Sequence, residues 1–248
     1  MPTLPRRWLF AVILMLLTRS VAVAAERKHG EFADEKIGVD GTDRVYRLVV
    51  PKSVDLDEPV PLVIAFHGIR IDNKDLMPKY SMLNETAEKH NFIITYPNGI
   101  DQSWGLRPEK VKKDLAFFDA LVKAIQDKYA IDSNQIYVVG MSNGAYFAHL
   151  IGKEGSASVA AVVAHSGAIG LGARRGIRAD RKFPVMIIHG DSDQLLNVRQ
   201  AQESRDKYKA EGHDVEYIEI PGLGHKWATE SDINEKIWKF LSEHPLKK

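Results

Sequence analysis

Residues 136–144 read IYVVGMSNG, a β-branched run that leads into Gly140-Met141-Ser142-Asn143-Gly144. The run is typical of a buried strand, and residues 145–151 have the apolar spacing of a helix. A turn that joins strand to helix this tightly needs glycine on both sides of the serine, because a Cβ there would clash with neighbouring backbone. Such a turn would push the Ser142 hydroxyl out above a sheet. The pattern alone is a weak signal, so a serine in an ordinary turn is the alternative.

Strand-like and helix-like segments alternate along the chain from residue 62 onward. Several of the strand-like runs are continuously apolar, as expected of strands that are covered on both faces. The alternation predicts an α/β fold in which helices cover both faces of a mostly parallel central sheet. The expected strands are residues 45–50, 62–66, 92–96, 136–139, 159–164, 185–189 and 215–220, and the expected helices are residues 76–90, 112–130, 145–151, 198–211 and 232–241. No repeat or linker divides the chain, and the polar residues before 43 are assigned no element.

The composition excludes several classes of function. With 44% hydrophobic residues among 248, the chain can bury a full core and is not a disordered protein. Lys and Arg number 34 against 33 Asp and Glu, so no global charge favours nucleic acid or an anionic membrane. The absence of cysteine excludes a thiol nucleophile, cysteine-ligated zinc and disulfides. No compact histidine motif for a metal is present either, and we expect no cofactor.

Residues 1–25 have the layout of a secretory signal peptide. Arg6 and Arg7 precede an apolar run at residues 8–17, which is too short to span a bilayer, and small residues follow at 21–25. We therefore expect residues 26–248 to form a single secreted or periplasmic domain, without stable membrane association after cleavage. A retained N-terminal anchor is the alternative.

Two later loops carry the partners that a serine nucleophile needs. A hydroxyl is a poor nucleophile until a histidine removes its proton and a carboxylate orients that histidine. In sheets of this kind the chain order is serine, carboxylate, histidine, each after a separate strand. The loop after residues 185–189 contains Asp191 and Asp193, and the loop after residues 215–220 contains His225. We predict Asp193 as the orienting carboxylate and His225 as the general base, with Asp191 as the alternative carboxylate.

Acyl transfer also needs N–H donors for the oxyanion that forms in its transition state. The backbone N–H of Asn143, at the start of the helix after Ser142, is the first predicted donor. The second should come from the loop after the strand at 62–66, which reads HGIR at residues 67–70. The glycine there lets the backbone approach a substrate oxygen, so we predict the N–H of Ile69, with that of Arg70 as the alternative.

With these residues in place, the chain resembles the secreted α/β-hydrolase esterases that include polyhydroxybutyrate depolymerases, feruloyl esterases and acetyl-xylan esterases. The matching stretches are PLVIAFHG at 61–68, YPNGIDQSW at 96–104, FFDALVKAIQDKYAID at 117–132, IYVVGMSNG at 136–144, HGDSD at 189–193 and PGLGHKW at 221–227. The resemblance implies the α/β-hydrolase fold, a catalytic triad of Ser142, Asp193 and His225, and a carboxylic ester as substrate. It also implies that Trp104 and Trp227 lie near the substrate cleft, although packing in the core or in loops is their alternative role.

The short connection between the strands at 159–164 and 185–189 leaves no room for a large lid domain. We therefore expect an open cleft and a bulky or polymer-linked ester. Residues 170–182 form a basic, glycine-rich segment, which is either a solvated loop or a contact for an anionic ligand. His165 ends a strand and could approach the site. A serine peptidase of the same fold and a catalytically inactive binding relative are the alternative functions.

Overall fold

The computed structural model describes residues 27–69, 73–105, 107–155, 157–170, 177, 179–229 and 232–247. The predicted signal peptide lies outside these residues, as does most of the basic segment at 170–182. In chain order the elements are β1 (Gly30–Val39), β2 (Thr42–Val50), β3 (Val60–Phe66), α1 (Met77–Ser81), α2 (Leu83–His90), β4 (Ile93–Pro97), the 3₁₀ turn η1 (Ile100–Gln102), α3 (Pro108–Lys128), β5 (Ile131–Met141), α4 (Asn143–Glu154), β6 (Ala161–His165), β7 (Val185–Gly190), α5 (Val198–Ala210), β8 (Val215–Ile220) and α6 (Ile233–Ser242).

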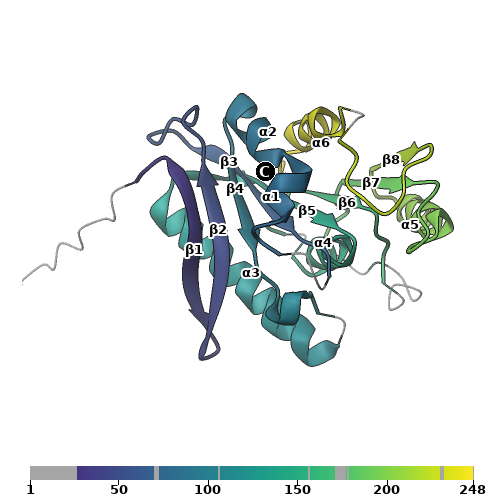
Figure 1. The fold of residues 1–248 in the computed structure, drawn as a ribbon, viewed down its shortest axis with the longest axis horizontal. Helices are drawn as coiled ribbons and strands as arrows, with labels where there is room; N and C mark the ends of the chain where they lie inside the picture. The colour runs from purple at the N-terminus through teal and green to yellow at the C-terminus, as the bar shows by residue number, and fades with distance from the viewer. Residues whose placement is uncertain are drawn as a thin grey trace, which may run out of the picture.

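The strands form one sheet in the order β1-β2-β4-β3-β5-β6-β7-β8 (Figure 1). β1 pairs antiparallel with β2, and β2 with β4, while every other neighbouring pair is parallel. The predicted α/β fold with a mostly parallel sheet is therefore confirmed. β1 was not predicted, because its residues alternate between exposed and half-buried at the edge of the sheet and include no continuous apolar run.

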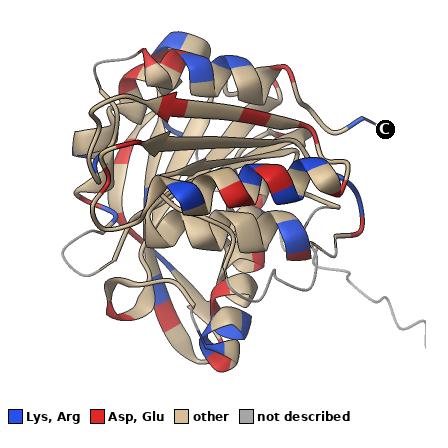
Figure 2. Ribbon diagram, turned by 90° about the vertical axis from the view of Figure 1, so that its right-hand side faces the viewer, with Lys and Arg blue, Asp and Glu red and all other residues tan. Residues whose placement is uncertain are grey.

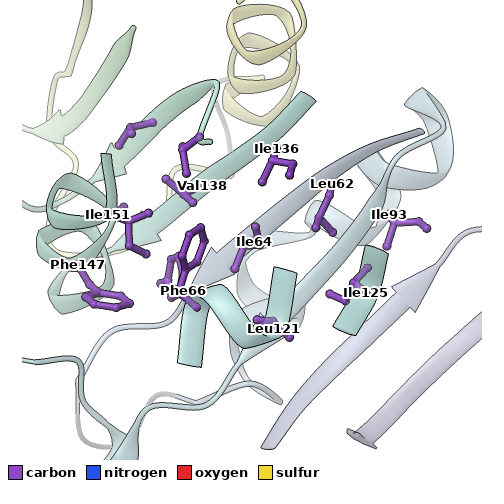
Figure 3. Close-up of a cluster of buried hydrophobic side chains, with 14 of the residues drawn as sticks. Leu62, Ile64, Phe66, Ile93, Leu121, Ile125, Ile136, Val138, Phe147 and Ile151 are labelled. Carbon is purple, nitrogen blue, oxygen red and sulfur yellow. The ribbon is translucent and has the colours of Figure 1, made fainter. Parts of the chain in front are cut away.

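Helices cover both faces of the sheet, and every strand except β1 contributes side chains to both buried clusters. Side chains of β3 and β5 that point to one face pack with α3 and α4, as Figure 3 shows for Leu62, Ile64 and Phe66. Their neighbours along the strand, such as Val63 and Ala65, pack on the other face with α1, α2 and α6. Both faces are thus buried without the help of a disulfide.

One predicted helix, residues 76–90, is divided into α1 and α2. The break falls at Met82, whose φ of 56° lies in the left-handed region and ends α1. No glycine or proline marks this position, so the break could not be seen in the sequence.

Most charged residues lie outside this core, and Arg44 and Asp114 are exceptions that are almost fully buried. Figure 2 shows acidic and basic residues interspersed along the helices. This distribution agrees with the near balance of 34 basic and 33 acidic residues. No helix in the described part of the chain is both long enough and apolar enough to cross a bilayer.

The turn between β5 and α4 depends on close backbone contact. A Cβ at Gly144 would lie 2.1 Å from the Phe66 carbonyl oxygen and 2.5 Å from that of His67. A Cβ at Gly140 would lie 2.2 Å from the Gly144 carbonyl oxygen. Both glycines are therefore required by space, as the sequence predicted, and α4 begins directly against the end of β3.

This contact predicts that Gly144→Ala destabilises the protein, because the helix must move away from β3 to make room for a methyl group. We expect the free energy of unfolding to fall by about 1–3 kcal/mol in chemical denaturation. Gly38→Ala is the matched control, since no atom lies within 4 Å of a Cβ there. Equal stability of the two variants would contradict the close packing.

Candidate active site

Ser142 occupies a strained turn at the carboxyl end of β5. Its φ of 54° and ψ of −115° lie outside the regions that L-residues favour. Hydrogen bonds hold it there: the Ser142 N–H donates to the carbonyl of His165 at 2.9 Å, and the Ser142 carbonyl accepts from the N–H groups of Ala145 and Tyr146. Backbone strain of this kind persists only where the surroundings enforce it, and it concentrates at functional sites.

The structure brings Ser142, His225 and Asp193 together from three separate loops. The Ser142 hydroxyl lies 2.9 Å from His225 Nε2, and His225 Nδ1 lies 2.7 Å from Asp193 Oδ2. Because an ionised carboxylate can only accept, Nδ1 carries the proton and Nε2 is free to accept one from the hydroxyl. This arrangement is chemically able to activate Ser142 as a nucleophile.

The Asp193 carboxylate is buried but well supplied with donors. Its Oδ1 accepts from the N–H groups of Leu195 and Leu196, each at 2.9 Å. Burial raises the pKa of Asp193, but the hydrogen bonds from Leu196, His225 and Leu195 outweigh burial and hold that pKa below its ordinary value. Asp193 is therefore ionised at neutral pH, as a partner of imidazolium must be.

A second imidazole, that of His189 near the end of β7, lies beside the same carboxylate. His189 Nε2 donates to the carbonyl of Leu196 at 2.8 Å and lies 3.4 Å from Asp193 Oδ2. Its side chain is fully buried. His189 thus packs against the loop between β7 and α5, which carries Asp191 and Asp193 and is called the acid loop below.

Asp191, the alternative carboxylate, has other partners. Its Oδ1 accepts from the N–H of Gly222 at 2.7 Å and from the hydroxyl of Ser192 at 2.9 Å. Gly222 has a φ of 71° and begins the loop that carries His225. Asp191 therefore stabilises the start of the loop that carries His225, whereas Asp193 contacts the imidazole of His225 itself.

His165 connects the serine turn to the histidine loop. Its carbonyl accepts from Ser142, and its Nε2 accepts from the N–H of Ala228 at 3.2 Å. Nδ1 therefore carries the proton and donates to the Ser166 hydroxyl at 3.0 Å. The ring also stacks on Trp227 at 4.6 Å. Burial, reinforced by neighbouring histidines, lowers the pKa of His165 to about 3, so the ring stays neutral and keeps this acceptor.

Both predicted oxyanion donors lie near one backbone junction. Asn143 begins α4, so its N–H cannot bond within the helix and points outward at the positive end of the helix dipole. Ile69 follows the end of β3, against which α4 begins. Among the described residues, no hydrogen bond uses the N–H of Asn143 or Ile69. Arg70, the alternative donor, lies outside the described residues.

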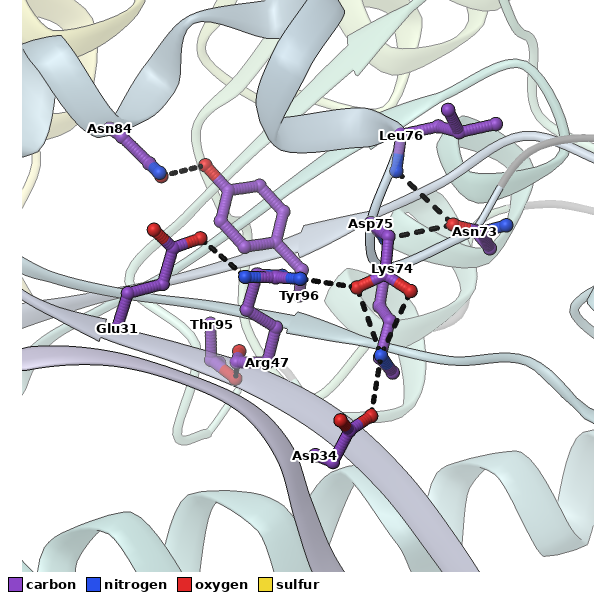
Figure 4. A network of polar contacts seen from close by, with 10 residues as sticks. All are labelled: Glu31, Asp34, Arg47, Asn73, Lys74, Asp75, Leu76, Asn84, Thr95 and Tyr96. Atoms are coloured by element: carbon purple, nitrogen blue, oxygen red, sulfur yellow. Dashed lines mark hydrogen bonds and ion pairs between the residues drawn. The ribbon is translucent and has the colours of Figure 1, made fainter.

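The segment that follows this loop is anchored at Asn73–Leu76 by a network of ion pairs (Figure 4). Asp75 pairs with Arg47 at 2.5 Å and with Lys74 at 2.9 Å, and Lys74 also reaches Asp34 at 3.0 Å. Arg47 extends the network to Glu31 on β1. Burial raises the pKa of Asp75, but the hydrogen bonds from Arg47 and Lys74 have the larger combined effect in the opposite direction. The pKa of Asp75 is therefore below its ordinary value. Lys74 and Asp75 are thus tied to β1 and β2.

The two predicted substrate-contacting tryptophans are buried. Trp104 is 0% exposed and stacks on Phe147, and Trp227 is 4% exposed and donates from its indole N–H to Asn234. The structure therefore places both behind the surface of the site. Exposed apolar side chains stand instead on the flanking loops, at Ile69 (41% exposed) and Leu195 (74% exposed). Neither was predicted as a contact through its side chain, because exposure of a single apolar residue leaves no sequence pattern. In the described residues, no cluster of three or more metal-ligating side chains is found.

The comparison with known sequences supports the resemblance to feruloyl and acetylxylan esterases. The bifunctional acetylxylan esterase/xylanase XynS20E of Neocallimastix patriciarum is 27% identical over 220 residues, which cover 74% of this chain but only 31% of that protein. A probable feruloyl esterase C of Aspergillus flavus is 25% identical over 198 residues, which cover 77% of this chain and 70% of that protein.

The comparison with solved structures supports the fold. A CE1 ferulic acid esterase from Anaeromyces mucronatus matches with a TM-score of 0.67 at 18% identity, covering 88% of this chain and 90% of that one. An acetyl xylan esterase from Aspergillus awamori matches with a TM-score of 0.68 at 15% identity, covering 83% and 98%. The family model for phospholipases and carboxylesterases matches residues 98–244, more than half of the chain. The chain therefore belongs to the phospholipase/carboxylesterase family of serine hydrolases with the α/β-hydrolase fold.

Proposed function

We propose that this chain is a secreted serine esterase that cleaves carboxylic esters of the feruloyl or acetylxylan type. The observation that carries the proposal is the chain of hydrogen bonds from Asp193 through His225 to Ser142, with distances of 2.7 and 2.9 Å. Relatives named as feruloyl and acetylxylan esterases support this class of ester. The layout of residues 1–25 supports secretion, with residues 26–248 as the mature domain. The likeness to polyhydroxybutyrate depolymerases stays a prediction.

In the first half of the reaction, Ser142 Oγ attacks the ester carbonyl carbon while His225 Nε2 takes the hydroxyl proton. The Asp193 carboxylate stabilises the resulting imidazolium. The carbonyl oxygen becomes an oxyanion, which the N–H groups of Asn143 and Ile69 bind, each donor contributing about 3 kcal/mol in the transition state. The intermediate collapses when His225 returns the proton to the leaving alcohol, and an acyl-serine remains.

In the second half, His225 takes a proton from water as the water oxygen attacks the acyl carbonyl. The same two N–H groups bind the second oxyanion. The carbon–oxygen bond to Ser142 then breaks, His225 returns the proton to Ser142 Oγ, and the acid is released. Ser142, His225, the leaving alcohol and water carry every proton that moves, so the proposed reaction requires no cofactor.

Two observations support an open site that admits a bulky or polymer-linked ester. The connection from His165, at the end of β6, to Val185, at the start of β7, is short for a lid domain. Ile69 and Leu195 present apolar surface to solvent on the loops beside Ser142. Exposed apolar groups at a catalytic mouth favour an apolar or aromatic acyl group.

The role of Ser142 predicts that Ser142→Ala abolishes hydrolysis of p-nitrophenyl acetate. We expect kcat to fall by about 10⁴- to 10⁶-fold, with an unchanged thermal midpoint, because the hydroxyl forms the acyl-enzyme. A fluorophosphonate probe should label the wild type and leave the variant unlabelled. Near-normal turnover by the variant would refute the nucleophile, and a folded wild type that resists the probe would favour a binding protein.

The two aspartates of the acid loop form a matched pair for the second test. Asp193→Asn should lower kcat by about 10⁴-fold, because an amide favours the wrong tautomer of His225 and cannot stabilise imidazolium. Asp191→Asn retains an oxygen that can accept from Gly222, so its kcat should stay within about tenfold of the wild type. The reverse order of effects would reassign the carboxylate to Asp191.

The substrate class predicts a ranking in a panel of methyl ferulate, acetylated xylan, polyhydroxybutyrate and a p-nitroanilide peptide. We expect the ferulate and acetyl esters to be cleaved and the anilide to resist, with kcat/KM as the measure. Ser142→Ala is the blank for each substrate. Preferential cleavage of the anilide would instead identify a serine peptidase of the same fold.

A further inference from the structure

A buried ion pair that takes no part in the proposed chemistry lies between β2 and α3. Arg44 on β2 contacts Asp114 on α3 at 2.8 Å, with side chains only 3% and 0% exposed. The guanidinium also lies 4.0 Å above the ring of Phe117. Pairs of this kind are a poor source of stability, because the cost of removing both charges from water commonly equals or exceeds their attraction.

The direction of the pKa values agrees with such a cost. Burial lowers the pKa of Arg44 and raises that of Asp114, and in each case it outweighs the attraction between the two groups. Apolar side chains of similar size could fill the space with equal or better stability. Stability alone therefore does not account for the pair, and the groups that it holds in place give another reason for it.

Asp114 binds the backbone of residues 104–105, which lie beside the turn that carries Ser142. Its Oδ2 accepts from the N–H of Gly105 at 2.8 Å. A Cβ at Gly105 would lie 2.6 Å from the backbone nitrogen of Val111, so this segment lies directly on the first turns of α3. The backbone of residue 105 is thus fixed by a charged acceptor on the helix beneath it.

The preceding residue reaches the first oxyanion donor. The Trp104 N–H donates to Asn143 Oδ1 at 2.6 Å, and Asn143 Nδ2 donates back to the Trp104 carbonyl at 3.4 Å. The side chain of the residue after the nucleophile is thereby held on both of its polar atoms. Since Asn143 begins α4, this contact sets the direction of the N–H that would bind the oxyanion.

Trp104 also contacts His67, which lies two positions before the second donor. Its indole N–H donates to the His67 carbonyl at 3.0 Å. The His67 ring accepts from the N–H of Gly99 through Nε2 at 3.0 Å, so Nδ1 carries the proton and donates to the Gly68 carbonyl at 2.7 Å. That carbonyl belongs to the same planar trans peptide as the Ile69 N–H, so fixing the oxygen fixes the direction of the N–H.

We propose that the Arg44–Asp114 pair is a positioning device for the oxyanion hole, acting through residues 104–105 on the N–H groups of Asn143 and Ile69. This inference rests on the proposed esterase function. An acceptor for the Gly105 N–H is what the position requires, and the bond from Arg44 holds the Asp114 carboxylate in place as that acceptor. Displacement of a catalytic group by about 1 Å can cost about 100-fold in rate, so a distant anchor of this kind has a measurable effect.

The test compares two double variants that both remove the buried charges. Arg44→Met with Asp114→Leu fills the space with apolar groups and deletes the acceptor for Gly105. Arg44→Gln with Asp114→Asn retains an acceptor oxygen and a hydrogen-bonded neutral pair. Thermal midpoint, kcat and KM for p-nitrophenyl acetate, and inhibition by phenylboronic acid are measured for each. The boronate forms a tetrahedral adduct on Ser142 and so reports on the oxyanion hole.

We expect the apolar double variant (the apolar pair, Arg44→Met with Asp114→Leu) to fold with a thermal midpoint no lower than that of the wild type. Its kcat should nevertheless fall by about 10- to 100-fold with little change in KM. Its affinity for the boronate should fall by a similar factor. The neutral polar pair should recover most of both losses. Such separation of stability from turnover is what a merely structural pair would not produce.

Wild-type kcat in the apolar pair would overturn the proposal. So would failure of that variant to fold, or equal losses of kcat in both variants together with lowered midpoints, since these results assign the pair a structural role. Failure of the esterase function itself is distinguishable, because the wild type would then show no turnover that Ser142→Ala removes.

Discussion

The arrangement of the site depends on one steric constraint, the contact between the first turn of α4 and the backbone that ends β3. The Gly144 position lies so close to the carbonyls of Phe66 and His67 that no side chain fits between them. Because of this contact, the N–H of Asn143 and the loop that carries Ile69 share one junction. The strained backbone of Ser142 follows from the same geometry, since a chain that reverses from strand to helix in one residue must leave the favoured regions.

The parallel register of the sheet supplies the rest of the site. Met141 pairs with His165, His165 with Ile188, and Gly190 with Ile220, so the carboxyl ends of β5, β6, β7 and β8 lie nearly level. Each loop that leaves this edge therefore starts at the same height. Side chains far apart in the chain, such as Ser142 and His225, can meet there without long excursions of the backbone.

Features with a local signal were predictable from the sequence, and features that depend on long-range packing were not. The continuous apolar runs of β3 and β5 predicted a buried parallel sheet, and the glycines around Ser142 predicted the tight turn. The break at Met82 has no local cause, and β1 lacks an apolar run. The contact between Arg44 and Asp114 joins residues that are 70 positions apart. Because charged side chains are usually exposed to solvent, the sequence predicts neither their burial nor their contact.

The two aspartates of the acid loop show why residue type and chain order identify a site better than they identify roles within it. Asp191 and Asp193 are equally able to partner a histidine, and only the turn after β7 separates them. One carboxylate is turned inward, where two N–H groups and His225 hold its pKa low, while the other faces the base of the histidine loop. Their roles follow from direction and burial, which are set by the hydrogen bonds of Leu195, Leu196 and Gly222. The same reasoning applies to Trp104, which is fully buried and donates to the His67 carbonyl, so that it is removed from the surface that a substrate would meet.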